Sequence, residues 1–330
     1  MTRILVTGAL GFVGPYLIDA LRLSHDSNIE IIATSKDAGH NALLGPVMAV
    51  DVTDHAALEV AICGVKPTHI INLAGLAAPT AADTDPNEAW QVHLHGALNL
   101  ARVILRRVPD CWLIQVGSGL VYGESAKAGR ALDENALLAP LDEYSASKAA
   151  ADLSLGPLIR SGLKCIRLRP FNHTGPGQSE AFVVPAFAMQ IARIEARLAP
   201  PIIRVGNLDA QRDFLDVRDV ANAYALVMKN LERLESGTIL NIASGIPRRI
   251  SDILASLVAR SSVDISVEQD LARQRDADIP ILVGDAGLAR KLLHWKPEHA
   301  FEDTLTAVLN ECRARSHPLA HHLDEITPTQ

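Results

Sequence analysis

Short apolar runs alternate with longer amphipathic stretches along the first half of the chain. The apolar runs predict buried strands of a parallel sheet, and they cover residues 3–7, 29–34, 48–50, 69–73, 112–116 and 163–168. The amphipathic stretches repeat apolar residues every three or four positions, which predicts helices over 12–23, from about Asp54, over 86–108 and over 143–159. Strands and helices in this alternation predict an α/β fold with a doubly wound parallel sheet, the Rossmann architecture.

The pattern changes beyond Pro170. Prolines and glycines cluster over 170–177, and helices and short strands then mix irregularly. We expect a Rossmann domain over 1–170 and a smaller mixed α/β lobe over 171–315. The two would be interleaved, because helices at about 219–235 and 301–314 are expected to return to the first domain. Residues 316–330 are polar and contain prolines, which predicts a loose tail.

Composition and charge exclude several classes of partner. The chain has 330 residues, is 48% hydrophobic and carries a formal net charge of -7, so we expect no nucleic-acid partner. No apolar run is long enough to span a membrane, and the chain enters a strand directly, without a signal peptide. The cysteines are scattered without metal-ligand spacing, at Cys63, Cys111, Cys165 and Cys312. We therefore expect a cytoplasmic protein with reduced thiols and no metal site.

Three glycines follow the first strand and open the first helix. Gly8, Gly11 and Gly14 let the backbone approach a pyrophosphate, and the helix N-terminus adds amide donors and a positive dipole. The alternative is a tight strand–helix turn without a ligand. The position between a strand and a helix favours dinucleotide binding.

The second strand ends at Thr34-Ser35-Lys36, where a dinucleotide's adenosine ribose is usually recognised. A hydroxyl at Ser35 and a cation at Lys36 suit a 2′-phosphate, which favours NADP(H). Asp37 would repel that phosphate if it turned inward, so NAD(H) stays possible. A solvated Lys36 without a ligand is the other alternative.

Tyr144 and Lys148 lie four residues apart, on one face of a predicted helix. A neighbouring ammonium would stabilise the phenolate and bring the pKa of the tyrosine closer to neutrality. Ser118 ends the fifth strand, at the sheet edge where ligands bind, and its hydroxyl could contact a substrate carbonyl. Taken alone, the tyrosine–lysine spacing is usually an exposed helix face. Together with Ser118 and the glycines, it predicts proton transfer beside a bound dinucleotide.

The glycine spacing and the Ser118, Tyr144 and Lys148 set resemble the extended short-chain dehydrogenase/reductase family. The resemblance implies that Lys148 also holds the nicotinamide ribose and that an Asp after the third strand contacts adenine, as Asp51 followed by Val52 would. It implies a set of cofactor-binding residues, namely Gly8, Gly11, Phe12, Val13, Gly14, Ser35, Lys36, Asp51, Val52, Leu73, Ala74, Gly75, Tyr144 and Lys148. Family members commonly pair through the helices at 86–108 and 143–161, so the resemblance also implies a homodimer.

The segments 169–178, 205–214, 275–278 and 295–297 resemble the group of GDP-mannose dehydratases and the reductases of GDP-6-deoxy-4-keto-mannose. This resemblance extends over nearly the whole chain, to about residue 313, and implies a GDP-sugar substrate. It implies substrate contacts by Ser118, Asn172, Val183, Arg212, Arg275 and Asp278. In particular, the two arginines would clamp the diphosphate. An ion pair of Arg212 with Asp213 or Asp216 is the alternative.

Leu120, two positions after Ser118, differs from the residue found in several relatives. The dehydratases of the family place a Glu there and the GDP-fucose synthases a Cys, and a leucine can replace neither. The resemblance therefore implies NADPH-dependent reduction of the C4 ketone of GDP-4-keto-6-deoxy-D-mannose to GDP-D-rhamnose or GDP-6-deoxy-D-talose. The segment 76–79 departs from relatives that supply a polar sugar contact there, which leaves the stereochemistry open. Two alternative functions stay open: another nucleotide-sugar epimerase or dehydratase, and a non-catalytic cofactor-sensing protein.

Overall fold

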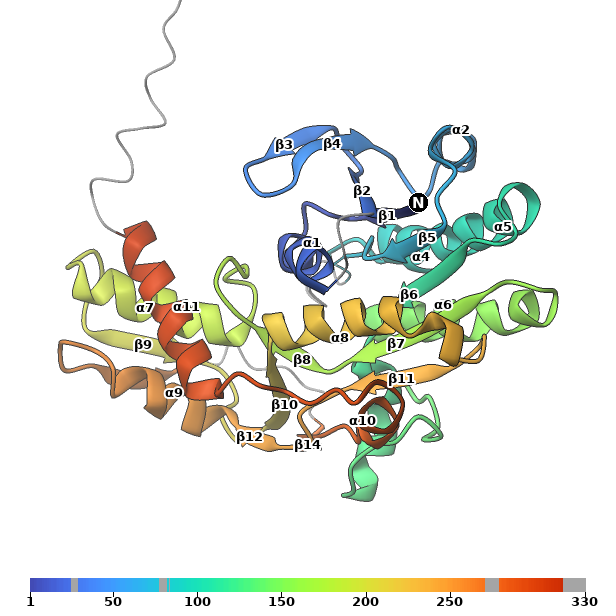
Figure 1. The fold of residues 1–330 in the computed structure, drawn as a ribbon. Helices are drawn as coiled ribbons and strands as arrows, with labels where there is room; N and C mark the ends of the chain where they lie inside the picture. Colours follow the sequence, from blue (N-terminus) through green and yellow to red (C-terminus); the bar gives the residue numbers. More distant parts are fainter. Residues whose placement is uncertain (25–28, 77–81, 83, 271–278, 317–330) are drawn as a thin grey trace, which may run out of the picture.

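The computed structural model describes residues 1–24, 29–76, 82, 84–270 and 279–316. Its largest feature is a sheet in the order β11-β7-β6-β5-β1-β2-β4-β3, in which only the edge strand β3 is antiparallel to its neighbour (Figure 1). The strands are β1 (Thr2–Thr7), β2 (Ile29–Ser35), β3 (Gly39–Asn41), β4 (Gly45–Ala49), β5 (His69–Asn72), β6 (Trp112–Val116), β7 (Cys165–Pro170) and β11 (Ile239–Ile242). The predicted doubly wound α/β architecture is confirmed.

Helices cover both faces of this sheet. One face carries α1 (Val13–Ser24), α8 (Val217–Lys229) and α10 (Gly287–Leu293), and the other carries α2 (His55–Val65), α5 (Gly96–Arg107) and α6 (Glu143–Arg160). Successive side chains of a strand point to opposite faces, so Ile4 and Val6 pack on the α1 side and Leu5 on the α2 side. Because both faces are covered, the central strands are mostly apolar and buried, as the sequence pattern predicts.

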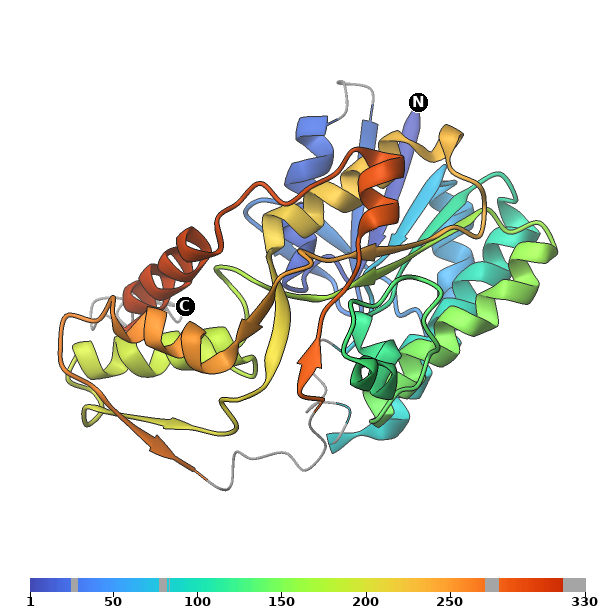
Figure 2. The same cartoon turned by 90° about the horizontal axis from the view of Figure 1, so that it is seen from below.

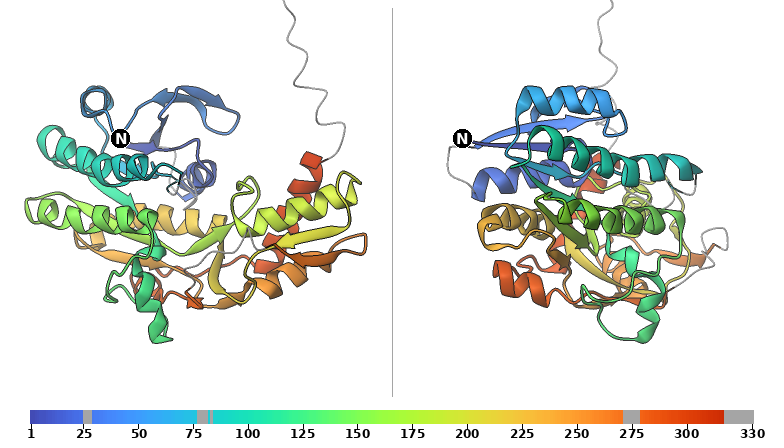
Figure 3. Two further views of the ribbon diagram at one scale, coloured as in Figure 1. Left: turned by 180° about the vertical axis from the view of Figure 1, so that it is seen from behind. Right: turned by 90° about the vertical axis from the view of Figure 1, so that its right-hand side faces the viewer.

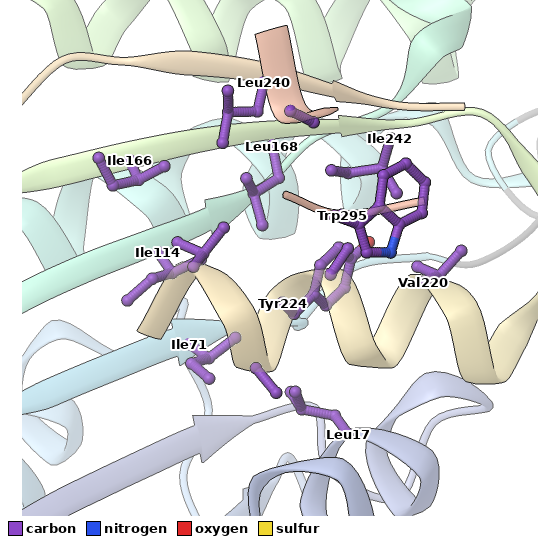
Figure 4. Close-up of a cluster of buried hydrophobic side chains, with 14 of the residues drawn as sticks. Leu17, Ile71, Ile114, Ile166, Leu168, Val220, Tyr224, Leu240, Ile242 and Trp295 are labelled. Atoms are coloured by element: carbon purple, nitrogen blue, oxygen red, sulfur yellow. The ribbon is translucent and has the colours of Figure 1, made fainter. Parts of the chain in front are cut away.

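The core on the α8 side is shown in Figure 4. Val220 and Tyr224 of α8 pack against Leu168 of β7 and Ile242 of β11, and Trp295 lies beside them. None of these side chains is more than 1% exposed. Burying each large apolar side chain contributes about 1.5–3 kcal/mol to folding. This core therefore stabilises the packing of α8 against the sheet.

A second, smaller core joins strands and helices from the later part of the chain (Figure 2). Strand β10 pairs with β8, β12 and β14, and β9 pairs with β13. The elements are β8 (Asn172–Thr174), β9 (Ile202–Val205), β10 (Gln211–Asp216), β12 (Pro247–Arg249), β13 (Ser266–Gln269), β14 (Ile281–Leu282), α7 (Val183–Glu195), α9 (Ile250–Val258) and α11 (Phe301–Ser316).

The expected return of residues 301–314 to the first domain is wrong. Helix α11 packs against α7 and α9, and Phe301, Leu305 and Leu309 are buried in the second core. Helix α8, by contrast, packs against α1 on the large sheet. Both segments predict helices, but the sequence does not show which apolar surface each helix will cover.

Three further differences separate the structure from the sequence prediction. The predicted continuous helix over 86–108 is α4 (Pro86–Trp90), a π-helical turn η1 (Gln91–His95) and α5. Strand β11 was not predicted, although it lies beside β7 in the large sheet. The third predicted strand, 48–50, is β4 and begins earlier, at Gly45, where a hairpin with β3 starts.

A buried ionic network fixes α6 to the sheet. The Asp152 carboxylate accepts hydrogen bonds from Arg169 at 2.9 and 3.1 Å and from Arg167 at 2.9 Å. Arg169 also donates to the Tyr122 hydroxyl at 2.9 Å. Asp152 and Arg169 are each only 3% exposed. Because Asp152 lies one turn after Lys148, the network sets the position of α6 along β7.

Within the described ranges, no helix is long and apolar enough to cross a membrane, and no group of three or more His, Cys, Asp or Glu residues could hold a metal ion. All four cysteines are free thiols; Cys63 is exposed and the other three are buried.

Candidate active site

A cavity of about 1340 Å³ extends from the carboxyl ends of the large sheet's strands to the second core. Every predicted site residue that the structure describes lines it: Gly8, Gly11, Phe12, Val13, Gly14, Ser35, Lys36, Asp51, Val52, Leu73, Ala74, Gly75, Ser118, Tyr144, Lys148, Asn172, Val183 and Arg212. Arg275 and Asp278 lie outside the described residues, as does most of the segment 76–79. The site residues expected from the sequence, as far as the structure describes them, therefore line one continuous cavity.

The glycine loop shapes one wall of the cavity. Gly8 has φ +65°, and an added Cβ would lie 2.8 Å from the Ala74 amide nitrogen. At Gly14 an added Cβ would lie 2.0 Å from the Ala9 carbonyl oxygen. Both contacts are with backbone and leave no room for a side chain. Helix α1, which begins at Val13, has no acidic residue in its first turn, so its N-terminal amides and dipole favour an anion such as a pyrophosphate.

The end of β2 forms one end of the cavity. Ser35 and Lys36 line it, and the Lys36 ammonium lies 3.6 Å from the Glu88 carboxylate of α4. Both side chains are largely exposed, so this ion pair is weak and leaves Lys36 able to turn toward a ligand. Asp51 accepts hydrogen bonds from the Thr53 amide and hydroxyl at 2.8 and 2.7 Å, which hold its carboxylate at the cavity wall.

Ser118, Tyr144 and Lys148 line the same cavity, and all three side chains are buried. Ser118 caps the 3₁₀ helix η2 (Gly119–Ala128), and its oxygen accepts the Leu120 amide proton at 3.1 Å. Its hydroxyl also lies close enough to the Tyr144 phenol to lower the pKa of that group. The Lys148 ammonium donates to the Val116 carbonyl at 3.5 Å. A phenol, a hydroxyl and an amine in one cavity can together donate a proton to a carbonyl oxygen and stabilise its charge.

Burial controls the ionisation of this group. It raises the pKa of Tyr144 to about 12, although the hydrogen bond from Ser118 acts in the opposite direction. It also lowers the pKa of Lys148 from 10.5 to about 8. The expectation that Lys148 brings the pKa of Tyr144 closer to neutrality is therefore not met in this structure, because loss of solvation and the charge of Asp142 both raise that pKa. A protonated phenol is, however, the form that a proton donor requires.

The far half of the cavity belongs to the second core. Asn172 begins β8, Val183 begins α7, and Arg212 lies on β10, where it donates to the Ile279 carbonyl at 2.7 Å. The carboxylates considered as alternative partners are engaged elsewhere. Asp213 accepts from the Ser244 hydroxyl and three backbone amides, and Asp216 accepts from Arg218 and Thr304.

Several residues near the catalytic group carried no recognisable sequence signal. Glu88 of α4, Gln178 after β8 and Tyr224 of α8 line the cavity, and His93 packs edge-on against the Tyr144 ring with 5.3 Å between ring centroids. Glu88, His93 and Tyr224 come from segments that predict only helix, and Gln178 ends the segment 169–178 without being singled out in it. Only the packing of α4, η1 and α8 around the sheet edge brings them to the site.

The comparisons with a family model, with known proteins and with solved structures agree with one another. The model of the NAD dependent epimerase/dehydratase family matches residues 4–243. The chain is 33% identical to GDP-6-deoxy-D-mannose reductase of Pseudomonas aeruginosa, over 95% of this chain and 98% of that protein. It is 26% identical to GDP-6-deoxy-D-talose 4-dehydrogenase of Aggregatibacter actinomycetemcomitans, over 86% of this chain and 88% of that protein. The solved structure of RMD from Pseudomonas aeruginosa complexed with NADPH superposes with a TM-score of 0.81 at 30% identity, covering 96% and 100% of the two chains.

Proposed function

The chain belongs to the NAD dependent epimerase/dehydratase family, and on this basis we propose that it reduces the C4 ketone of GDP-4-keto-6-deoxy-D-mannose to GDP-D-rhamnose with NADPH. The observation that carries the proposal is the single cavity in which Ser118, Tyr144 and Lys148 lie between the glycine loop and Arg212. The names of the two relatives, a GDP-6-deoxy-D-mannose reductase and a GDP-6-deoxy-D-talose dehydrogenase, support a GDP-sugar with chemistry at C4.

In the proposed mechanism, bound NADPH supplies a hydride to C4. Tyr144 donates its phenolic proton to the C4 oxygen, which Ser118 holds by a hydrogen bond. Lys148 stabilises the negative charge that develops on the tyrosine and the sugar oxygen. Leu120, which packs beside Tyr144, offers no acid, base or thiol for the elimination or epimerisation reactions of relatives.

Recognition is proposed to divide between the two parts of the molecule. The glycine loop, Ser35, Lys36, Asp51 and the 73–75 segment would bind the cofactor, and Lys36 would leave Glu88 to hold the 2′-phosphate of NADP(H). Asn172, Val183 and Arg212, with Arg275 and Asp278, would bind the GDP-sugar. The free thiols support a cytoplasmic location. Helices α5 and α6 lie side by side (Figure 3). On α6, the apolar side chain of Leu153 is 61% exposed, which supports a homodimer interface formed by these helices.

Incubation of the purified protein with NADPH and the ketosugar is expected to oxidise NADPH and to give GDP-D-rhamnose, identified by NMR of the product. NADH should support slower turnover at equal concentration, because Lys36 then has no phosphate to bind. Recovery of the talose epimer would overturn the stereochemical assignment. Formation of a ketosugar from GDP-mannose without added reductant would instead indicate a dehydratase.

Turnover is expected to fall as the pH rises through about 8. The Lys148 ammonium loses its proton there, whereas Tyr144, with a pKa of about 12, stays protonated and able to donate. Below this value Lys148 is charged and the rate should level off. The Lys148→Arg variant keeps its charge at every working pH, so its profile should lack the alkaline decline even if its maximum is lower. An unchanged decline in that variant would assign the titration to another group. The measurement is kcat against pH for both proteins.

A further inference from the structure

His93 is a buried histidine beside the catalytic group that the mechanism above does not use. It lies in the π-helical turn η1, between α4 and α5, and is 2% exposed. A π-helical turn inside an α-helix carries a local energetic penalty and often occurs at functional sites. Here the turn directs the imidazole toward the start of α6 and toward the segment that follows β5.

Hydrogen bonds at both ring nitrogens fix the protonation of His93. The Leu76 backbone amide donates to Nε2 at 3.0 Å, so this nitrogen carries no proton. At the other side, Nδ1 lies 2.8 Å from the Ser147 hydroxyl oxygen. The single proton of that hydroxyl is donated to the Tyr144 carbonyl at 2.9 Å, so Nδ1 must be the donor to Ser147. The hydrogen bonds at the two ring nitrogens are therefore both consistent with a neutral ring that carries its proton on Nδ1.

The electrostatic surroundings favour this neutral form. Burial, together with the positive charge of Lys148, lowers the pKa of His93 to about 2. The ring therefore stays uncharged at any working pH and adds no second cation beside the ammonium of Lys148.

The ring contacts Tyr144 and lies close enough to Lys148 to feel its charge. Its edge packs against the Tyr144 ring in a T-shaped arrangement. At Gly75, an added Cβ would lie 3.0 Å from the Lys148 ammonium and 3.1 Å from the His93 ring. The backbone of residues 75 and 76 thus lies against both side chains, and the bond from Leu76 to Nε2 fixes it there.

We propose that His93 is a positioning residue that ties the cavity wall at residues 75–76 to the first turn of α6 and so orients Tyr144 and Lys148 for proton transfer. The bond to Leu76 is the decisive one. Without the imidazole, Ser147 keeps its bond to the Tyr144 carbonyl, whereas the Leu76 amide loses the acceptor that Nε2 provides. This role rests on the proposed ketone reduction.

Two substitutions separate the two bonds. A glutamine at position 93 can place its amide oxygen where Nε2 lies and keep the acceptor for Leu76. An asparagine is shorter, and its amide nitrogen replaces Nδ1 and keeps only the donor to Ser147. His93→Ala removes both bonds. His95→Ala provides the matched control, because His95 lies in the same turn with an exposed side chain.

We expect His93→Ala and His93→Asn to lower kcat by about 10–100-fold, since a displacement of about 1 Å at a reacting group can reduce rates by about 10²-fold. His93→Gln should stay within about 5-fold of the wild-type kcat, as should His95→Ala. NADPH affinity, followed by its fluorescence, should change little in all four variants. Wild-type kcat in His93→Ala, or an equal loss in His93→Asn and His93→Gln, would overturn the proposal.

The protonation of the two His93 ring nitrogens can be measured in the wild-type protein without any substrate. Nitrogen-15 NMR of the histidine rings, with the His93 signals identified by their absence in His93→Gln, is expected to show a proton on Nδ1 and none on Nε2 at neutral pH. A proton on Nε2, or a doubly protonated ring, would overturn the role of His93. Failure of the wild-type protein to reduce the ketosugar would instead refute the proposed function, and the NMR result would still decide the state of His93.

Discussion

Tyr144→Phe is expected to lower kcat for ketosugar reduction by about 10²–10⁴-fold, the range that a positioned general acid provides. The substitution removes the proton donor and keeps the aromatic ring. The ring's packing against His93, Ala82 and Ala89 should therefore persist. NADPH binding should change little, because the residues proposed to hold its phosphates and adenosine, in the glycine loop and at the end of β2, are unchanged.

The rate is measured as NADPH oxidation in single-turnover and steady-state experiments, with cofactor affinity measured separately. Tyr16→Phe is the matched control, since the Tyr16 hydroxyl donates to the Pro176 carbonyl at 2.8 Å and does not line the cavity. Turnover within a few-fold of wild type in Tyr144→Phe would remove Tyr144 from the mechanism. A large loss of NADPH affinity would assign it to binding rather than to proton transfer.

Asp152→Asn is expected to lower the free energy of unfolding by about 3–5 kcal/mol, the usual effect of removing one partner of a buried ion pair. Arg169 would then be a buried guanidinium without its counter-charge, because Asp152 supplies both of its carboxylate contacts. Arg167, itself 14% exposed at its side chain, loses the same partner. The asparagine is close to isosteric, so the loss arises from charge rather than from a cavity.

The thermal midpoint of unfolding provides the measurement, with chemical denaturation if unfolding is reversible. Asp110→Asn serves as the control, because the Lys164–Asp110 ion pair is exposed, with the Asp110 side chain 97% accessible. That variant should unfold at the wild-type midpoint. An unchanged midpoint in Asp152→Asn would mean that solvent reaches the network and compensates the charge. Activity of the Asp152 variant below its midpoint tests whether the position of α6 also governs Tyr144 and Lys148.

The sequence was most informative where local signals and burial agree. The glycine loop, the carboxyl ends of the strands and the Tyr144–Lys148 spacing all lie where the pattern predicted, because a parallel sheet brings its strand ends to one edge. A helix was expected from about Asp54, and the Asp54 carboxylate caps α2 by accepting from the amides of Ala56 and Ala57. These features depend on neighbours within a few residues, or on a topology that the alternation of strands and helices already specifies.

The pattern predicted less well where long-range packing decides. Residues 301–314 form the expected helix, yet its apolar face packs against α7 rather than the large sheet. Strand β11 pairs with β7 about seventy residues later in the chain, and a strand of four residues, three of them apolar, does not identify its partner. The π-helical turn at His93 lies within a continuous helical pattern, which gave no sign of it.

By itself the sequence determined the doubly wound architecture, the dinucleotide loop and the pairing of Tyr144 with Lys148, since each follows from periodicity, glycine geometry or helical spacing. The tertiary structure alone decided which way the pKa values of Tyr144 and Lys148 move, because burial depends on every element that closes over them. The tertiary structure likewise brings His93 to Ser147, which lies 54 residues later in the chain. The His93 Nδ1 atom is 2.8 Å from the Ser147 hydroxyl oxygen. Desolvation and contact are properties of the packed molecule, and no local pattern specifies them.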